Sequence, residues 1–233
     1  MEALGLLAGG VAHDLNNILS GVTGYAELML MKLLEDSLFR KHAGAIKDSG
    51  ERAAAVVADM LTISRNAASN KKITNLNRLI QEYLYSPEHA ALIKRFPQVS
   101  LCSNLSDDLF NLSCSTTHIK KIIMNLVLNA AEATVAGEVS LSTENCYINH
   151  PFGQYEKVAV GEYVLMRVCD AGPGIAEEDI EHIFDPFFSR KTMGHSGTGL
   201  GLTVVWNTVQ DHQGYIDVEA LKKGCCFKVY LPV

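Results

Sequence analysis

The chain has 233 residues, of which 48% are hydrophobic, and its formal net charge is -6 at pH 7. The hydrophobic fraction excludes a disordered chain and is enough for one or two packed domains. The acidic balance argues against nucleic acid as a partner. No apolar run approaches the roughly 20 residues that cross a bilayer, and the start lacks the features of a signal peptide. We therefore expect no membrane contact by this segment and a cytoplasmic location, with a parent protein that could be membrane-anchored.

The first 64 residues have the periodicity of two long helices. Steps of four and three pick out a heptad-like seam in the first, which comprises Leu4, Ala8, Val11, Leu15, Ile18, Val22, Tyr25, Met29 and Lys32. A polar break, LEDSLFR (34–40), precedes a second seam, which comprises Ile46, Gly50, Ala53, Val57, Met60 and Ser64. One hairpin cannot bury both seams, so we predict that two copies form a dimeric four-helix bundle. The first helix begins almost at Met1, and we expect a fragment of a longer protein.

The pattern changes where the composition turns polar, at NAASNKK (66–72), and we predict two domains, residues 1–69 and residues 70–233. Alternating apolar segments predict strands at 98–105, 138–148, 162–170, 214–220 and 225–233. Helices are predicted at Thr117–Ala133, capped by Ser115 or Thr116, and after Gly201. Strands and helices do not alternate regularly, so the predicted fold class is α+β, a helical hairpin followed by an α/β sandwich.

The six cysteines show no C-x-x-C spacing and no accompanying histidine pattern; they are Cys102, Cys114, Cys146, Cys169, Cys225 and Cys226. In a chain without a signal peptide, such cysteines are typical of reduced, buried thiols. We therefore expect neither a metal site nor a disulfide framework.

The first candidate for chemistry is His13. With the seam at positions a and d, His13 takes position f, which points farthest from the bundle core. Asp14 adjoins it, and Asn17 lies one helical turn further on the same face. A neutral imidazole can attack a phosphoryl group, and a neighbouring carboxylate can stabilise the cation that forms. The alternative is a solvated surface histidine. Gly9 and Gly10 are either close-packing residues or a soft point in the helix before the nucleophile.

The second domain contains four further motifs. NLVLNAAEA places Asn125 and Asn129 on one helix face, where amide oxygens can ligate Mg²⁺ beside phosphates, although a buried polar pair has the same spacing. DAGPGI ends a strand with Asp170, a carboxylate placed to accept a hydrogen bond from an exocyclic amine. Gly172 and Gly174 then allow the backbone to approach a flat ring. These features favour a nucleotide site.

GTGLGL (197–202) opens a helix, and glycine amides at a helix N-terminus suit phosphate. It is not a dinucleotide fingerprint, because no G-x-G-x-x-G follows a strand. IFDPFFSRK places three phenylalanines and Lys191 before a short loop that contains glycine, although an apolar stripe is more typical of a core. The motifs follow one another over about 80 residues, which makes chance assembly implausible.

With these motifs the chain resembles the transmitter core of a sensor histidine kinase of a two-component system, in particular the group with an AHDxNN histidine box. GGVAHDLNNIL looks like the phosphoacceptor box and NLVLNAAEA like the asparagine box. DAGPGI and GTGLGL look like the two glycine boxes, and IFDPFFSRK like the phenylalanine box. The resemblance covers nearly all of the chain.

The resemblance implies a hairpin for dimerisation and phosphotransfer, followed by the ATP-binding sandwich shared with gyrase and a heat-shock chaperone. It implies that ATP with Mg²⁺ phosphorylates His13, beside Asp14 and Asn17, and that the phosphoryl group passes to an aspartate of a response-regulator receiver domain. Dephosphorylation of the regulator, with Asn17 orienting water, is a second implied activity. Asn125 and Asn129 would also hold the metal. The implied nucleotide contacts are Asn125, Asn129, Asp170, Gly172, Gly174, Ile175, Phe187, Lys191, Gly197, Thr198, Gly199, Leu200, Gly201 and Leu202.

The sequence departs from the family pattern at three places. Ile18 stands where many histidine kinases have proline, so a kink need not occur there. Cys225 and Cys226 stand where relatives usually carry threonine, which puts one polar contact near adenine in doubt. Glu132 stands where some kinases have lysine. Two other functions stay open: a nucleotide-binding but degenerate dimeric scaffold, and an ATPase of the same fold that acts on another substrate.

Overall fold

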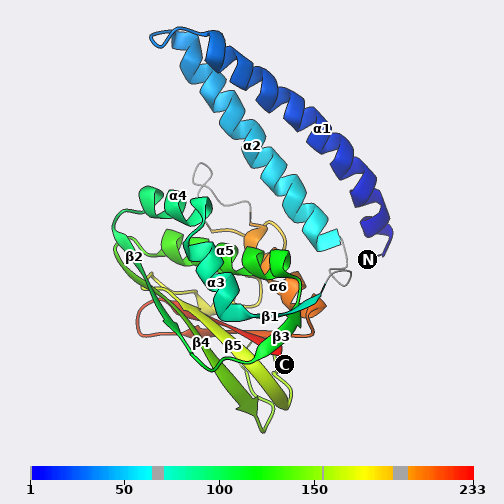
Figure 1. The fold of residues 1–233 in the computed structure, drawn as a ribbon, viewed down its shortest axis with the longest axis vertical. Coiled ribbons are helices and arrows are strands. Elements are labelled where there is room, and N and C mark those ends of the chain that lie inside the picture. Colours follow the sequence, from blue (N-terminus) through cyan, green and yellow to red (C-terminus); the bar gives the residue numbers. More distant parts are fainter. Residues whose placement is uncertain (1, 65–70, 154, 191–198) are drawn as a thin grey trace. The chain divides into compact units, whose positions relative to one another are not determined.

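The computed structural model describes residues 2–64, 71–153, 155–190 and 199–233, with the backbone alone at 2–13 and 60–64. The chain forms two compact units, Met1–Asn66 and Ala67–Val233 (Figure 1). The boundary predicted between residues 69 and 70 lies outside the described residues and stays a prediction.

The first unit is a hairpin of two antiparallel helices, α1 (Glu2–Lys32) and α2 (Leu38–Ser64), as the two seams predicted (Figure 1). Small residues let the helices approach closely. Ala26 and Ala43 are buried, and a Cβ atom on Gly50 would lie 2.6 Å from Cγ2 of Thr23. The guanidinium of Arg40 donates to two carbonyl groups at the end of α1, at 2.8 and 3.0 Å, and so satisfies acceptors that the helix leaves open.

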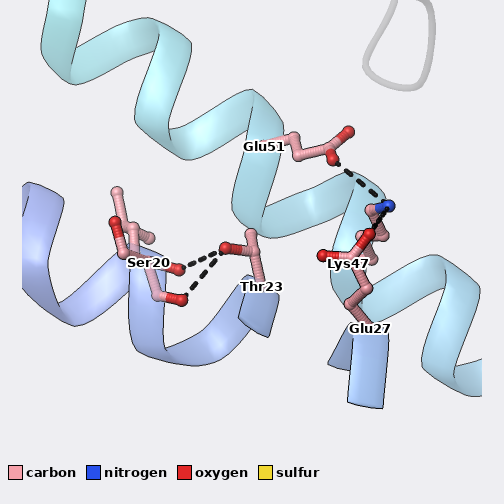
Figure 2. A network of polar contacts seen from close by, with 6 residues as sticks. Ser20, Thr23, Glu27, Lys47 and Glu51 are labelled. Atoms are coloured by element: carbon pink, nitrogen blue, oxygen red, sulfur yellow. Dashed lines mark hydrogen bonds and ion pairs between the residues drawn. The ribbon is translucent and has the colours of Figure 1, made fainter. Parts of the chain in front are cut away.

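An ion pair also connects the two helices. The Nζ atom of Lys47 on α2 lies 3.0 Å from Oε1 of Glu27 on α1 and 3.9 Å from Oε1 of Glu51 (Figure 2). All three side chains are partly exposed, so this cluster favours the antiparallel register but contributes little to stability.

Much of the predicted seam of α1 remains in contact with solvent within a single chain. The exposed fractions range from 40% to 74% for Leu15, Ile18, Val22, Tyr25 and Met29. α1 is one uninterrupted helix through Ile18, where the kinases with proline would be kinked.

The second unit contains a five-stranded mixed sheet in the order β2-β4-β5-β7-β6. β2 pairs with β4 in parallel, and the other neighbours are antiparallel. All five predicted strands are present, and their bounds are Val99–Leu105 (β2), Gly137–Ile148 (β4), Gly161–Cys169 (β5), Tyr215–Ala220 (β6) and Cys225–Pro232 (β7). A separate pair, β1 (Lys72–Asn75) and β3 (Asn111–Cys114), was not predicted. The confirmed fold class is therefore a hairpin followed by an α/β sandwich.

Helices cover one face of this sheet (Figure 1). The two predicted ones are α5 (Thr116–Ala133) and α6 (Gly201–Asp211), and the two that were missed are α3 (Leu76–Leu84) and α4 (Pro87–Arg95). Capping residues mark both missed helices, because Asn75 accepts from the amide of Asn77 and Ser86 accepts from the amide of His89.

The main core lies between the helices and the sheet, and a smaller cluster lies on the other face. Val164, Met166 and Val168 of β5 point into the main core, whereas Tyr163 and Leu165 belong to the smaller cluster. This alternation is the period of two that a strand imposes, and it decides which residues of β5 and β7 face the helices. No helix within the described residues is long and apolar enough to cross a membrane.

A buried histidine joins α5 to α6. The backbone N–H of Ser115, the N-cap residue of α5, donates to Nε2 of His212 at 3.0 Å, and Nδ1 of His212 donates to the carbonyl of Thr208 at 2.7 Å. The side chain of Ser115 makes no capping hydrogen bond. Burial lowers the pKa of His212, because removal from water disfavours the charged form of the ring.

We expect this histidine to make the second unit less stable in mild acid. The folded state keeps His212 neutral, whereas the unfolded chain binds a proton below about pH 6.5. The free energy of unfolding should therefore be fully present above that pH and fall as the pH drops through the window below it, towards the lowered folded pKa. His212→Gln keeps an acceptor for Ser115 and should flatten this pH dependence in urea titrations.

The matched control is His150→Gln, which changes an exposed histidine and should leave the slope unchanged. If His212→Gln retains the slope of the parent protein, another group causes it.

Candidate functional site

The carboxylate of Asp170 is held at the end of β5 from two sides. Asp170 is 6% exposed, and its backbone N–H donates to the carbonyl of Cys225 on β7 at 2.9 Å. Its Oδ1 accepts from the N–H of Gly172 at 2.8 Å, and its Oδ2 accepts from the Cys225 thiol at 2.9 Å. Burial, and next the Asp170 carboxylate, raise the pKa of the Cys225 thiol, so the thiol keeps the proton that it donates.

The glycines around Asp170 allow contacts between backbones. A Cβ atom on Gly172 would lie 2.6 Å from the carbonyl oxygen of Ala133, at the end of α5. A Cβ atom on Gly224 would lie 1.9 Å from the carbonyl oxygen of Asp170, and Gly224 and Gly174 both have a φ of 81°. Gly172 is therefore required for close packing, and Gly174 for a left-handed backbone conformation.

The asparagine motif lies beside the start of α6. Asn125 is 8% exposed, and its Nδ2 donates to the carbonyl of Gly201 at 3.2 Å. Asn129 is half-buried one turn further along α5. Glu132, on the following turn, pairs with Arg95 at 3.4 Å, so the negative charge noted in the sequence has a cationic partner. The described residues contain no group of three or more His, Cys, Asp and Glu side chains that could hold a metal ion.

Phe187, in the phenylalanine motif, contacts Gly199, which lies two residues before α6. The N–H of Phe187 donates to the carbonyl of Gly199 at 3.0 Å, and each residue has a φ of 67°. A Cβ atom on Gly199 would lie 2.5 Å from the carbonyl carbon of Phe187. Leu200 is buried, and Leu202 packs against the core. The predicted contacts Lys191, Gly197 and Thr198 lie outside the described residues.

The three phenylalanines have different surroundings. Phe184 is 5% exposed and Phe188 packs against the core, whereas Phe187 is 62% exposed. Ile175, from the first glycine motif, is also partly buried against this core.

Sequence analysis missed the ion pairs that hold the end of the phenylalanine motif. The guanidinium of Arg190 pairs with Glu178 and, at 2.8 Å, with the largely buried carboxylate of Asp179. Both acids lie in a short 3₁₀ turn, Glu177–Asp179. The run of acidic residues was a visible signal, but only the fold shows which cation reaches it.

The predicted phosphoacceptor residues lie on α1. The backbone of His13 is helical, and its side chain lies outside the described residues. Asp14 and Asn17 are exposed on the same helix. Their residue numbers differ by three, so they lie on neighbouring turns of one face.

The cysteines require a correction. We expected reduced thiols, but Cys169 and Cys226 form a disulfide. They lie 57 residues apart in sequence, and the antiparallel register of β5 and β7 places them directly opposite each other. Register is a tertiary property that spacing between cysteines does not reveal, which is why the sequence argument failed. Cys102, Cys114, Cys146 and Cys225 are free.

The fold and the motifs together define an ATPase domain that follows a phosphoacceptor hairpin. Residues 114–233 match the family described as histidine kinase-, DNA gyrase B-, and HSP90-like ATPase, and residues 3–69 match the His Kinase A (phospho-acceptor) domain. The chain belongs to this ATPase family, and the two domains in series make it the core of a sensor histidine kinase.

Individual proteins agree with this assignment. The sensor histidine kinase ZraS of Klebsiella oxytoca is 31% identical over 235 residues, which are all of this chain and 47% of that protein. Full-length ShkA in complex with AMPPNP has the same fold, with a TM-score of 0.74 over 97% of this chain and 45% of its own, at 24% identity. ThkA in complex with the response regulator protein TrrA has a TM-score of 0.61 over 98% of this chain and 61% of its own, at 25% identity. The chain spans less than half of the curated relatives that it matches first.

We expect Gly172→Ala to destabilise the second unit. The added methyl group would meet the carbonyl oxygen of Ala133 at 2.6 Å and Oδ1 of Asp170 at 2.9 Å, and backbone cannot yield as a flexible side chain does. Overpacking of this kind typically costs about 1–3 kcal/mol of unfolding free energy, measured by chemical denaturation. Gly201→Ala is the matched control, because its Cβ would lie 3.6 Å from the nearest atom, on Asn125. Equal stability of the two variants would contradict the steric argument.

Proposed function

We propose that this chain is an ATP-dependent protein-histidine kinase that phosphorylates its own His13 and passes the phosphoryl group to an aspartate of a response-regulator receiver domain. The observation that carries the proposal is the fixed, buried carboxylate of Asp170, in a chain whose other domain contains His13 within a phosphoacceptor match. ATP is then both the ligand of the second unit and the phosphoryl donor.

Asp170 is suited to recognise the exocyclic amine of adenine. A carboxylate can accept about four hydrogen bonds, and the two described here leave it further capacity. The thiol of Cys225 stands in the place of the usual threonine and still donates to Asp170. The departure at this position therefore preserves a donor, although a thiol is a weaker one than a hydroxyl.

The residues around α6 fit a nucleotide with its magnesium ion. Mg²⁺ prefers oxygen ligands and is usually held by one or two protein groups together with phosphates. The Asn125 amide donates its N–H to Gly201, which keeps the amide beside the glycine motif, and Asn129 is the proposed second ligand. When bound, Mg²⁺ would neutralise phosphate charge.

The remaining nucleotide contacts are proposed from the motifs. Backbone amides at the start of an eleven-residue helix, α6, favour an anion. The proposed contacts to phosphate or to the flat ring are Gly172, Gly174, Ile175, Phe187, Lys191, Gly197, Thr198, Gly199, Leu200, Gly201 and Leu202.

The chemistry on α1 follows from the residues beside His13. An imidazole nitrogen bonds to the γ-phosphorus of ATP while the bond from that phosphorus to the bridging oxygen breaks, so ADP leaves. Asp14 would hold the other ring N–H and stabilise the developing imidazolium. Asn17 would orient water for a second reaction, the removal of phosphate from the receiver aspartate.

A second copy of the chain is the proposed partner of the hairpin. The exposed apolar side chains along α1 are those that a four-helix bundle would bury, whereas the faces between α1 and α2 already contain Ala26, Ala43 and Val57. The proposed receiver partner is supported by the similar protein ThkA, whose structure contains a response regulator. Since ATP is the substrate, we also propose that this segment acts in the cytoplasm.

Labelling with γ-labelled ATP and Mg²⁺ tests the kinase. We expect a label on His13 that is lost in acid and stable in base, because a phosphoramidate hydrolyses when it is protonated. His13→Gln should abolish the label and leave ATP affinity unchanged. Asp170→Asn should instead weaken ATP binding roughly tenfold, because losing a charged hydrogen-bond acceptor costs about 1.5–3 kcal/mol.

The control is His42→Gln, which changes an exposed histidine of the same hairpin and should label normally. A nucleotide-binding scaffold would bind ATP but transfer no phosphoryl group, and an ATPase with another substrate would turn over ATP without an acid-labile label. Label that persists in His13→Gln would overturn the assignment.

We also expect Asn17 and Asp14 to serve different reactions. In phosphorylation of His13 the Asn17 amide is a bystander, whereas in dephosphorylation it can both donate to and accept from the attacking water. Asn17→Ala should therefore leave labelling largely intact and slow the loss of phosphate from a purified receiver. Asp14→Asn should chiefly slow labelling. If both variants reduce labelling equally, this division of roles is wrong.

A further inference from the structure

The Cys169–Cys226 disulfide lies next to Asp170 at the end of β5. Cys169 and Cys226 are one residue pair of the β5–β7 ladder; Asp170 follows Cys169 in the chain, and Cys225 precedes Cys226. The N–H of Asp170 continues the ladder by donating to the carbonyl of Cys225 at 2.9 Å. The covalent link and the proposed adenine-binding carboxylate are thus neighbours on the same two strands.

The disulfide pair, Cys169 and Cys226, and the pair formed by Asp170 and Cys225 lie on opposite faces of the sheet. Val168, Cys225 and Phe227 belong to the core beneath the helices, so the alternation of a strand directs Cys169 and Cys226 to the other face. Cys226 is buried, at 2% exposed, whereas Cys169 is only half-buried. A reagent can therefore reach the disulfide from the Cys169 side without entering the nucleotide site.

We propose that the Cys169–Cys226 disulfide is a site of reversible thiol–disulfide exchange with dithiol reductants, and that its state sets the affinity of the second unit for nucleotide. A thiolate sulfur of the dithiol attacks one sulfur of the disulfide, and the other cysteine sulfur leaves. The second sulfur of the reductant then attacks the reductant's own sulfur in the mixed disulfide and releases the remaining cysteine. The Cys169–Cys226 bond breaks and the reductant becomes a cyclic disulfide. Its two hydrogens end on the sulfurs of Cys169 and Cys226, so electrons and atoms balance.

The disulfide can affect nucleotide binding because it lies at the end of the β5–β7 ladder, next to Asp170. Cys169 is the last residue of β5, and beyond it Asp170 is tied to β7 by one backbone hydrogen bond and the Cys225 thiol. Residues at the end of a ladder open more readily than those within it. The disulfide joins the final pair covalently and so keeps Asp170 and Cys225 in place before nucleotide arrives, which reduces the ordering cost of binding.

The test compares ATP affinity of the full chain in both states, by calorimetry with and without dithiothreitol. Mass spectrometry of alkylated peptides reports whether Cys169 and Cys226 are linked. Reduction should weaken ATP binding about threefold or more through lost preorganisation, and removal of the reductant followed by a small-molecule disulfide should restore it. Cys169→Ser should bind as the reduced protein does under both conditions. Cys102→Ser, which changes an exposed cysteine on β2, should respond like the parent protein.

A second measurement does not depend on nucleotide. Reduction should speed amide exchange in the peptide that contains Asp170, because its N–H bond to Cys225 lies beside the disulfide. Equal ATP affinity in both states, or unchanged exchange after complete reduction, would overturn the inference. The inference rests on the proposed function, and the two can fail separately. Absence of ATP binding in both states refutes the proposed function, whereas unchanged exchange refutes the coupling itself.

Discussion

The position of one carboxylate, that of Asp170, is the constraint on which the rest of the second unit depends. A buried carboxylate is costly unless donors surround it, and here a backbone amide and a thiol supply them. Those donors are available only because Gly172 and Gly224 let two loops come within contact of Asp170. The turn after β5, the turn before β7 and the end of α5 therefore pack against one another around Asp170.

The helices beside this group are joined by polar contacts rather than by packing alone. Asn125 holds the first residue of α6 and His212, just after the end of α6, holds the cap of α5. Phe187 and Gly199 close the segment that leads into α6. The N–H of Ser115 is a backbone group that the start of α5 would otherwise leave open, and its bond to His212 satisfies it.

The elements that sequence reasoning found are those with long or regular patterns. The two seams, the five strands and α5 and α6 have enough periodic residues to be recognised, and the histidine kinase motifs locate Asp170 and Asn125. β1, β3, α3 and α4 were missed because short elements carry few periods, although Asn75 and Ser86 were readable caps. The disulfide, the Arg190 ion pairs and the His212 contact join residues distant in sequence, and such pairings follow from register and packing that no local pattern encodes.

The helical hairpin buries small side chains and leaves larger apolar ones exposed, unlike the α/β sandwich. Its buried contact uses alanine and glycine, which allow close approach but remove little apolar area from water, while larger side chains such as Tyr25 and Met29 remain exposed. Apolar side chains in the described part of α1 are therefore still available for contact with a second copy. It follows that α1, which contains His13, would gain stability from the proposed dimer, whereas the contacts that hold Asp170 lie within one chain. The proposed phosphoryl acceptor and the proposed nucleotide site would then respond to different influences, the first to association and the second to the state of its own sheet.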